Sequence, residues 1–398
     1  MEGAAGERPL TGTDSARRRH VHLYFSPWQL ESRAWRAGAT ALEAGLADRV
    51  DYIGYRAEGF EDEERIDERQ AIRRIGARPP KPGSPRLLRA LSLPKWWLAA
   101  RRTQATPDVS IVQAHSIAAL PAGVLVARRS GAGLLYDAHE LETEREGWSP
   151  LVRWLARRFE KFLIRRCDHT IVVNDTIREW YERAYPGASV STVRNVPVIP
   201  AERGVSRLRE RIGLGPEPLL YAYCGLIGQG RGLFEMIEAF GGLGDAHHFV
   251  IVGFGPMEAE VRAAVEKHSN VHFHPAVPQS ELIALLRGAD VGAFVPSGTS
   301  ISYHHSLPNK VFEYAAAGLG LLVSDAPELK RFASEYPLAR SIPVSSAAIR
   351  EAVSSWSAEE IRRGRATMRF VPPSWKDEVR HLLRAYELVE QRAAARRR

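Results

Sequence analysis

Residues 308–318 read PNKVFEYAAAG, and this short stretch decides how the rest of the chain is interpreted. Pro308 stands where proline commonly opens a helix, and Gly318 stands where glycine commonly closes one. Lys310 and Glu313 are three residues apart, so both charged side chains lie on one face of the predicted helix. The remaining residues are mostly apolar, which predicts a buried helix whose charged pair needs a polar partner.

Two glycine-rich stretches lie upstream of this helix, each between an apolar run and a predicted helix. Residues 225–232 read GLIGQGRG, and residues 253–256 read GFGP. Glycine lets the backbone approach a ligand, and a helix N-terminus offers unpaired N–H groups to a phosphate. Arg231 adds a positive charge, although either stretch is also typical of a plain strand-to-helix turn. The glycines expected to contact a ligand are Gly228, Gly230, Gly253 and Gly255.

Short apolar runs alternate with helical patterns along both halves of the chain. In the first half the clearest runs are 20–26 (HVHLYFS), 108–114 (DVSIVQA) and 169–173 (HTIVV), and the pattern restarts at 219–224 (LLYAYC). Buried strands that alternate with helices predict a parallel sheet covered on both faces. The predicted fold class is therefore α/β, with two tandem Rossmann-like domains.

The domain boundaries follow from where this alternation breaks. The break lies at residues 197–207, while residues 58–107 fit neither pattern. The last segment has the pattern of an amphipathic helix with a basic tail, which we expect to be frayed. The predicted parts are a disordered tail at 1–20, a first domain at 21–200, a second domain at 201–371 and a helix at 372–398.

The composition narrows the class of protein and of partner. The chain has 398 residues, of which 44% are hydrophobic, so two full cores can form. The formal charge of +8 favours an anionic partner, and the absence of a nucleic-acid motif leaves a diphosphate substrate or an anionic membrane. Cys167 and Cys224 lack metal-ligand spacing and are expected to be buried thiols. No signal-peptide pattern or membrane-spanning run is apparent, which predicts a cytoplasmic protein.

Two basic stretches of the first half suit a membrane surface. Residues 86–102 read RLLRALSLPKWWLAARR, and residues 151–166 add six more basic side chains. Basic residues mixed with tryptophan are typical of helices that lie on an anionic lipid surface. The alternative is that Trp96 and Trp97 belong to the core and that the arginines face water.

The combination of these stretches, in this order, resembles the GT-B-fold glycosyltransferases of family 4, also called group 1. Further parts of the resemblance are residues 107–142, which include YDAHELE, residues 168–181 (DHTIVVNDTIREWY) and residues 193–197 (VRNVP). The resemblance implies two Rossmann-like domains that face each other across a cleft. It also implies a nucleoside diphosphate sugar as donor, no metal or other cofactor, and a C-terminal helix that returns to the first domain.

The resemblance further implies roles for individual residues. Arg231 takes the place of a lysine that binds the donor diphosphate, and Glu313 takes the place of a glutamate that binds the nucleotide ribose. Groups at strand ends in the first half would contact the sugar or the acceptor, and one would act as general base if the transfer inverts configuration. These candidates are His115, Asp137, His139 and Glu140, with Asn195 before the linker and Asn309 at the helix start.

Two positions depart from the family pattern. A glutamate is expected eight residues before Glu313 and an arginine five residues before Arg231, but the chain has His305 and Leu226 there. We expect Lys310 to supply the missing cation, and His304, His305 or Ser306 to contact the donor sugar.

The expected function is transfer of a sugar from a nucleoside diphosphate sugar to an acceptor, with retention of configuration and without a metal ion. The acceptor would be a lipid-linked or cell-surface glycan precursor of the cell envelope. The protein would then be cytoplasmic, or peripheral on the inner face of the membrane. Two alternatives stay open: an inactive sugar-nucleotide-binding partner of another transferase, and a sugar-nucleotide epimerase on the same fold.

Overall fold

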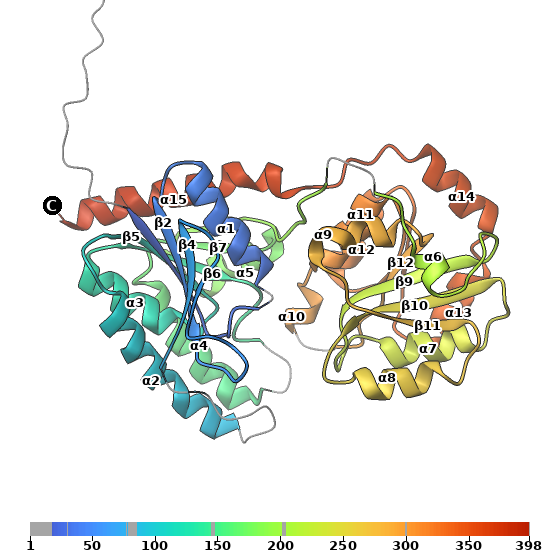
Figure 1. Cartoon of the computed structure of the whole chain (residues 1–398), viewed down its shortest axis with the longest axis horizontal. Coiled ribbons are helices and arrows are strands. Elements are labelled where there is room, and N and C mark those ends of the chain that lie inside the picture. The colour runs from blue at the N-terminus through green and yellow to red at the C-terminus, as the bar shows by residue number, and fades with distance from the viewer. Residues whose placement is uncertain are drawn as a thin grey trace, which may run out of the picture. The chain divides into compact units, whose positions relative to one another are not determined.

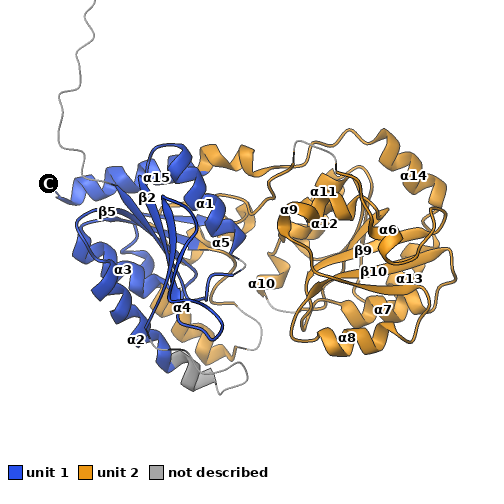
Figure 2. Ribbon diagram, in the orientation of Figure 1, with its two compact units in different colours: residues 1–137, 161–171, 382–398 blue, residues 138–160, 172–381 orange. Residues whose placement is uncertain are grey.

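The structure is a computed structural model that describes residues 18–29, 31–76, 78, 86–144, 148–200, 204–298 and 301–397, with the backbone alone for 86–90. The chain forms two compact units (Figure 2). The first comprises Met1–Asp137, Lys161–Ile171 and Leu382–Arg398, and the second comprises Ala138–Glu160 and Val172–His381. Most of the tail predicted at 1–20 lies outside the described residues.

The first half of the chain builds an eight-stranded sheet in the order β3-β4-β2-β1-β5-β6-β7-β8. β1 pairs in parallel with β2 and β5, β2 pairs in parallel with β4, and β3 is antiparallel to β4. The central strands are buried on both faces, which explains the nearly continuous apolar runs in the sequence. The strands are β1 (Arg19–Tyr24), β2 (Arg49–Tyr55), β3 (Glu63–Arg65), β4 (Gln70–Ile75), β5 (Val109–His115), β6 (Gly133–Ala138), β7 (His169–Val172) and β8 (Val190–Thr192).

Helices cover both faces of this sheet (Figure 1). Successive side chains of a strand point to opposite faces, so contacts of neighbouring residues identify the helix on each face. Gly123 of α3 lies against Ala114 and Leu134, whereas Gly133 lies against Val389 of α15 on the other face. The helices of the first half and of the C-terminus are α1 (Ser32–Glu43), α2 (Arg86–Gln104), α3 (Leu120–Ser130), α4 (Pro150–Ile164), α5 (Asp175–Ala184) and α15 (Trp375–Arg397).

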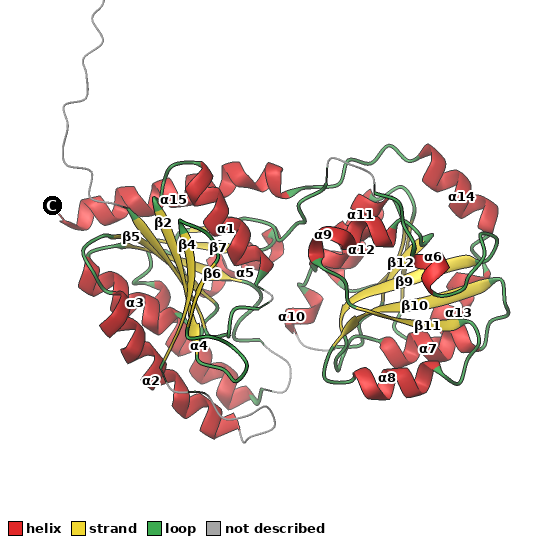
Figure 3. Cartoon of the chain, in the orientation of Figure 1, coloured by secondary structure: helices red, strands yellow, loops and turns green. Residues whose placement is uncertain are grey.

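The second half of the chain builds a six-stranded sheet in the order β11-β10-β9-β12-β13-β14, and its described strand pairs are parallel. Helices lie on both faces of it, as Figure 3 shows. The predicted α/β fold class with two parallel sheets is thereby confirmed. The strands are β9 (Leu219–Leu226), β10 (His247–Phe254), β11 (Val271–Pro275), β12 (Val291–Phe294), β13 (Gly320–Ser324) and β14 (Ala339–Ile342). The helices are α6 (Leu208–Arg211), α7 (Leu233–Gly241), α8 (Glu258–Val265), α9 (Gln279–Leu286), α10 (Ile301–His304), α11 (Asn309–Ala317), α12 (Pro327–Glu335), α13 (Ser346–Ser354) and α14 (Ala358–Thr367).

Residues 58–107, which fit neither sequence pattern, contain β3, β4 and α2. The strand β4 reads QAIRRI, and its charged residues conceal it from a search for apolar runs. Arg74 of this strand is 2% exposed and donates hydrogen bonds to the carbonyl oxygens of Pro27 (2.7 Å) and Glu61 (2.6 Å). It also pairs with the carboxylate of Glu64 at 2.9 Å. The buried guanidinium is therefore satisfied by groups that the sequence alone does not bring together.

The C-terminal helix α15 packs against the first sheet through to its last described turn. Tyr386 donates a hydrogen bond to Oε1 of Gln113 (2.7 Å), and Ala393 is buried. Arg396 forms an ion pair with the carboxylate of Asp168. Another arginine of the helix donates a hydrogen bond to the backbone carbonyl oxygen of Asp168. The expectation of a frayed basic tail is wrong, because these arginines bind fixed acceptors of the first unit.

The contact between β6 and α15 can be tested by filling the space at Gly133. A Cβ there would lie 2.4 Å from Val389 Cγ1 and 3.2 Å from the Val389 carbonyl oxygen. We expect Gly133→Ala to lower the free energy of unfolding by about 1–3 kcal/mol in urea denaturation, the usual cost of overpacking. Gly244→Ala is the matched control, since a Cβ at Gly244 meets nothing within 4 Å. Equal stability of the two variants would contradict the contact.

Candidate functional site

Helix α11 places the predicted charged pair beside the carboxyl end of β9, a central strand of the six-stranded sheet. It spans Asn309–Ala317, and Gly318 ends it with a φ of 73°, as the sequence predicts. Tyr314 fixes the helix to the sheet, because its hydroxyl accepts a hydrogen bond from the backbone N–H of Cys224 (3.0 Å). Gly292 leaves room for this ring: a Cβ there would lie 2.1 Å from Tyr314 Cγ. The helix is therefore held in one position by backbone and packing together.

The ammonium group of Lys310 lies among aromatic rings at the end of β9. Its Nζ donates a hydrogen bond to the hydroxyl of Tyr223 (2.9 Å) and lies 4.0 Å and 4.5 Å from the ring centroids of Tyr223 and Phe294. A Cβ on Gly225 would lie only 3.1 Å from this Nζ. Lys310 is 8% exposed, and within the described part of the chain its ammonium group forms no ion pair with a carboxylate. Ring faces attract a cation but do not neutralise it.

Burial shifts the titration of Lys310 into the neutral range. Burial lowers the pKa of the amine to about 7, and the positive charge of Arg231 lowers it as well, while Cys224 and Glu313 act in the opposite direction. The amine is thus close to its titration point at neutral pH. An anion placed beside it would favour the protonated form.

Glu313 lies one turn from Lys310 and is 5% exposed. Its Oε1 accepts a hydrogen bond from Nε2 of Gln279 on α9 (2.7 Å), and its Oε2 accepts one from the thiol of Cys224 (3.6 Å). Burial, and then the charge of Glu313, raise the pKa of the Cys224 thiol, which keeps it a donor. A carboxylate has about four acceptor positions, so this arrangement is compatible with further hydroxyl donors such as those of a ribose. Cys224 is a buried thiol as predicted, whereas Cys167 is only half-buried.

The two glycine-rich stretches meet because β9 and β10 are neighbours in register, with Gly225 opposite Gly253. A Cβ on Gly253 would lie 2.0 Å from the Gly225 carbonyl oxygen, and one on Gly255 would lie 2.1 Å from that of Ile227. These two glycines are required for the close approach of two backbones. Gly228 is different, since a Cβ there would meet only a leucine methyl group at 4.0 Å. Gly230 adopts a φ of 75°, which favours glycine without any ligand.

Two polar atoms, one just before α11 and one at its first residue, have no described hydrogen-bond partner. Within the described part of the chain, Nδ1 of His305 and Oδ1 of Asn309 are buried and form no hydrogen bond. Burial also lowers the pKa of His305, so the ring is neutral at physiological pH. Ser306 next to it is half-buried. Because nearly all buried polar atoms in proteins are paired, this segment indicates a place that water or a ligand fills.

Arg231 lies in the same region of the second unit, at the start of α7. Its guanidinium lies 5.8 Å from the ring centroid of Tyr303 on α10, and its charge acts on Lys310. Leu226, which stands where the family pattern has an arginine, is 44% exposed. The region therefore contains two cations, one carboxylate and two unpaired polar atoms, a set suited to an anionic ligand with hydroxyl groups.

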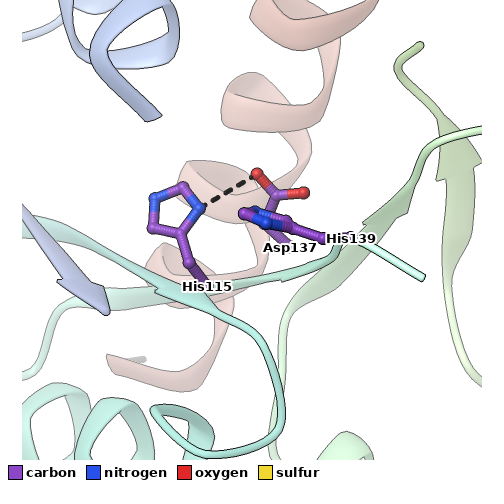
Figure 4. Close-up of side chains that lie close together, drawn as sticks. All are labelled: His115, Asp137 and His139. Atoms are coloured by element: carbon purple, nitrogen blue, oxygen red, sulfur yellow. Dashed lines mark ion pairs between the residues drawn. The ribbon is translucent and has the colours of Figure 1, made fainter. Parts of the chain in front are cut away.

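A second cluster lies at the ends of β5 and β6 (Figure 4). Asp137 is fully buried and accepts hydrogen bonds from Nε of Arg33 (3.0 and 3.1 Å) and from Nε2 of Gln113 (3.0 Å). Nδ1 of His115 lies 3.2 Å from the same carboxylate, and its Nε2 lies 3.1 Å from Nδ1 of His22. Asp137 is the anion of a buried network, and this geometry argues against the expected role of Asp137 as a general base.

The residues His115, Asp137 and His139 offer ligand atoms within 4.8 Å of one another, which makes them a candidate metal site. Asp137, however, already neutralises the guanidinium of Arg33, which would repel a metal cation. His115 has both ring nitrogens within hydrogen-bond distance of neighbours. We therefore interpret the cluster as a structural network, beside which His139 is half-buried.

Two other predicted residues of the first half, Glu140 and Asn195, differ in their surroundings. Glu140 is half-buried just after β6. Asn195 is half-buried in the segment that anchors α15, where Arg194 pairs with Glu378 at 2.6 Å. A structural role of the Asn195 segment is therefore supported by contacts. Ser116, which no sequence signal marks, adopts a φ of 69° directly after β5, a strained conformation for a residue other than glycine.

The sequence patterns do not mark the residues that surround the charged pair. Tyr223 carried a weak signal, because a buried tyrosine hydroxyl normally needs a partner. Phe294 and Gln279 carried none, since they come from β12 and from a helix 34 residues before Glu313. Only the folded chain brings them to α11.

Two known family descriptions match the chain. "Glycosyltransferase Family 4" matches residues 37–197, and "Glycosyl transferases group 1" matches residues 220–353. The first range contains the Asp137 network, and the second contains both glycine-rich stretches and α11. The chain belongs to the family 4 glycosyltransferases. The resemblance inferred from the sequence is confirmed.

Individual relatives agree with this family. TuaC of Bacillus subtilis (strain 168), a putative teichuronic acid biosynthesis glycosyltransferase, is 27% identical over 189 residues, which cover 48% of this chain and 42% of TuaC. The match thus spans less than half of that relative. Sucrose-phosphate synthase from Thermosynechococcus elongatus aligns with a TM-score of 0.71 at 16% identity, over 96% of this chain and 98% of that one. Anabaena HepE in complex with UDP-glucose aligns with a TM-score of 0.66 at 13% identity, over 95% of this chain and 98% of that one. These structures establish the shared GT-B glycosyltransferase fold.

The Asp137 network predicts a large stability effect at a position that the sequence suggests is catalytic. Asp137→Ala leaves the Arg33 guanidinium buried without its anion, which should cost about 3–5 kcal/mol of free energy of unfolding. The double variant Asp137→Ala, Arg33→Met removes both charges and should recover most of this loss. Urea denaturation of the two variants measures these changes in the free energy of unfolding. Wild-type stability of Asp137→Ala would refute the network.

The lowered pKa of Lys310 predicts a pH-dependent stability. The amine titrates near its usual value of about 10.4 in the unfolded chain, and near 7 in the folded protein. Between these values only the unfolded chain binds the proton, so the free energy of unfolding rises with pH, by at most about 1.4 kcal/mol per pH unit. Lys310→Met removes this contribution. The variant should have a higher free energy of unfolding than the wild type near neutral pH, and this difference should shrink towards about pH 9.5.

Urea denaturation at several pH values tests this, with Lys330→Met as control, because Lys330 is an exposed lysine of the neighbouring helix α12. A stability difference between Lys310→Met and the wild type that stays constant over the range would contradict the buried, shifted amine.

Proposed function

We propose that this protein transfers a sugar from a nucleoside diphosphate sugar to a glycan or lipid-linked acceptor. In this proposal Lys310 and Arg231 bind the donor diphosphate, and Glu313 binds the hydroxyls of the ribose. The transfer proceeds with retention of configuration, and cationic side chains rather than a metal ion stabilise the leaving group.

The observation that carries the proposal is the buried ammonium of Lys310 without a described carboxylate in ion-pair contact. A buried cation is unfavourable unless an anion compensates it. The ammonium lies at the end of β9, and in open parallel sheets ligands bind beyond the carboxyl ends of the strands. A diphosphate at this point would both compensate the charge and favour protonation of the amine, whose pKa is about 7 in the free protein.

The chemistry follows from where charge develops. When the bond from the anomeric carbon to the diphosphate oxygen breaks, its electron pair passes to the leaving diphosphate. Positive groups fixed beside that oxygen stabilise it most in the transition state. The acceptor hydroxyl bonds to the anomeric carbon from the same face, and its proton passes to the leaving phosphate. No protein base is then needed, which accords with the engagement of Asp137 by Arg33.

The sugar itself is assigned to the segment before α11. His305 and Asn309 have buried polar atoms without partners in the described chain. A hydroxyl group of the sugar can donate a hydrogen bond to each of these atoms. A neutral His305 in place of a glutamate would accept or donate one hydrogen bond without adding charge. Ser306 is the remaining candidate. The half-buried His139 and Glu140 are proposed to meet the acceptor.

The acceptor class rests on chemistry and on the relatives. TuaC is named for teichuronic acid biosynthesis, and the structure of Anabaena HepE is a complex with UDP-glucose. We propose an acceptor from polysaccharide biosynthesis of the cell envelope. Such acceptors carry lipid anchors, which would place the protein on the inner face of the membrane.

Nucleotide release from donor sugars tests the proposal. A thermal-shift screen of UDP-, GDP-, dTDP- and ADP-sugars identifies the donor, and Arg231→Ala and Glu313→Gln should each lower kcat/KM for its turnover by about 100-fold or more. The exposed pair Arg262 and Glu258 of α8 provides matched controls, Arg262→Ala and Glu258→Gln, which should leave turnover unchanged. Full activity of Arg231→Ala with the donor would refute its role.

The same assay separates the alternatives. An inactive sugar-nucleotide-binding partner would show a thermal shift with a donor but no nucleotide release, an outcome that the replacement of a glutamate by His305 favours. An epimerase would convert the sugar of the donor, which product analysis detects.

A further inference from the structure

Helix α4 exposes large apolar side chains to solvent. Leu151 is 66% exposed, Phe162 55%, Trp154 53% and Leu155 52%. Together with Phe159, three of these fall at intervals of four, four and three residues, so they form one outward stripe along the helix. Single exposed leucines are ordinary, but a contiguous apolar face on one helix marks a contact surface.

The opposite face of α4 is already used for packing. Glu160 is fully buried and accepts hydrogen bonds from the hydroxyls of Tyr181 of α5 (2.8 Å) and of Tyr185 directly after that helix (2.5 Å). Leu163 and Ile164 are buried as well. The outward stripe is therefore an additional apolar surface, and turning the helix would not bury it.

Positive charges border the stripe. Arg166 lies 3.5 Å from the ring centroid of Phe162, and Arg158 lies 5.2 Å from that of Trp154. Neither these arginines nor Arg165 form an ion pair with a described carboxylate. Glu160, the one acidic residue between positions 150 and 166, is buried, so the outer surface carries positive charge alone.

We propose that α4 docks into the surface of an anionic lipid bilayer. The stripe of Leu151, Leu155, Phe159 and Phe162 enters the boundary between headgroups and acyl chains, and the bordering arginines bind lipid phosphates. This is the position of an interfacial amphipathic helix whose apolar face meets lipid and whose basic residues reach the headgroups. Among the described helices, none combines the length and apolarity needed to cross a bilayer. The inference rests on α4 alone and is independent of the proposed reaction.

The tryptophans of α2, which the sequence suggested for a membrane surface, are buried or half-buried. Trp96 is 1% exposed and donates its indole N–H to the Gly54 carbonyl oxygen (2.8 Å). Trp97 is half-buried and donates to the Ala118 carbonyl oxygen (2.8 Å). The expectation that these rings lie on a membrane is wrong for Trp96, which belongs to the core. The exposed tryptophan of these two basic stretches is instead Trp154 of α4.

A second copy of the chain fits this face less well than lipid does. A symmetric dimer would bring the same patch of each copy together, so that Arg158, Arg165 and Arg166 would face like charges. Lipid phosphates offer the opposite charge at the border and apolar chains at the centre. Charge complementarity therefore favours the bilayer.

Co-sedimentation of the full chain with vesicles tests the proposal. We expect binding to vesicles of phosphatidylcholine with phosphatidylglycerol, and little binding to phosphatidylcholine alone. Leu151→Gln, Leu155→Gln, Phe162→Gln as a triple variant should lower the partition coefficient by at least about tenfold. Arg158→Gln with Arg165→Gln should lower it by about fivefold for each charge removed and weaken its salt dependence.

The controls separate docking from folding and from the proposed function. Val205→Gln with Val371→Gln replaces two apolar residues that are 90% and 88% exposed elsewhere, and should leave vesicle binding unchanged. The α4 variants should keep the wild-type thermal unfolding and donor-dependent nucleotide release measured without vesicles. Absence of wild-type binding to anionic vesicles would overturn the proposal. So would wild-type binding by the triple variant, or a solution dimer that the triple variant abolishes while vesicles have no effect.

Discussion

A charge that is taken out of water must find an opposite charge or a set of hydrogen bonds, and this constraint organises much of the structure. Arg74 is satisfied by two carbonyl oxygens and Glu64, and Asp137 is satisfied by Arg33 and Gln113. Lys310 is the exception among these groups, since among the described residues only a tyrosine hydroxyl and ring faces meet its ammonium. The cost of burying a charge thus explains why the Asp137 network is stable and why an anion would stabilise the ammonium of Lys310.

Close backbone packing determines where that exception can occur. Gly253 and Gly255 allow the ends of β9 and β10, and the residues directly after them, to approach within distances that no Cβ would permit. Gly292 admits the ring of Tyr314, which ties α11 to the strand beside it. Several glycines that resemble a phosphate-binding pattern in the sequence thus serve the sheet first. The charged pair of α11 lies beside the ends of the strands that these glycines bring together.

The surface of the protein follows a different rule. Charge and apolar area are combined on α4, whereas the tryptophans of α2 are used to hold that helix to its own unit. In the sequence the two segments look alike, because both are basic and contain tryptophan. Burial distinguishes them, and burial depends on what packs against each helix.

The sequence by itself determined the fold class, the family and the identity of α11. Apolar periodicity, the glycine spacing and the PNKVFEYAAAG stretch are local patterns, and each reflects a conformation that neighbouring residues impose on one another. The sequence patterns did not predict β4, where Arg73 and the buried Arg74 interrupt the apolar run. They also did not predict the C-terminal tail, where fixed acceptors order the helix. The tertiary structure alone decided which charges are compensated. Gln279 reaches Glu313, Arg33 reaches Asp137, and no described carboxylate pairs with Lys310, because these contacts join segments that are distant in the chain and that only the packed sheets bring together.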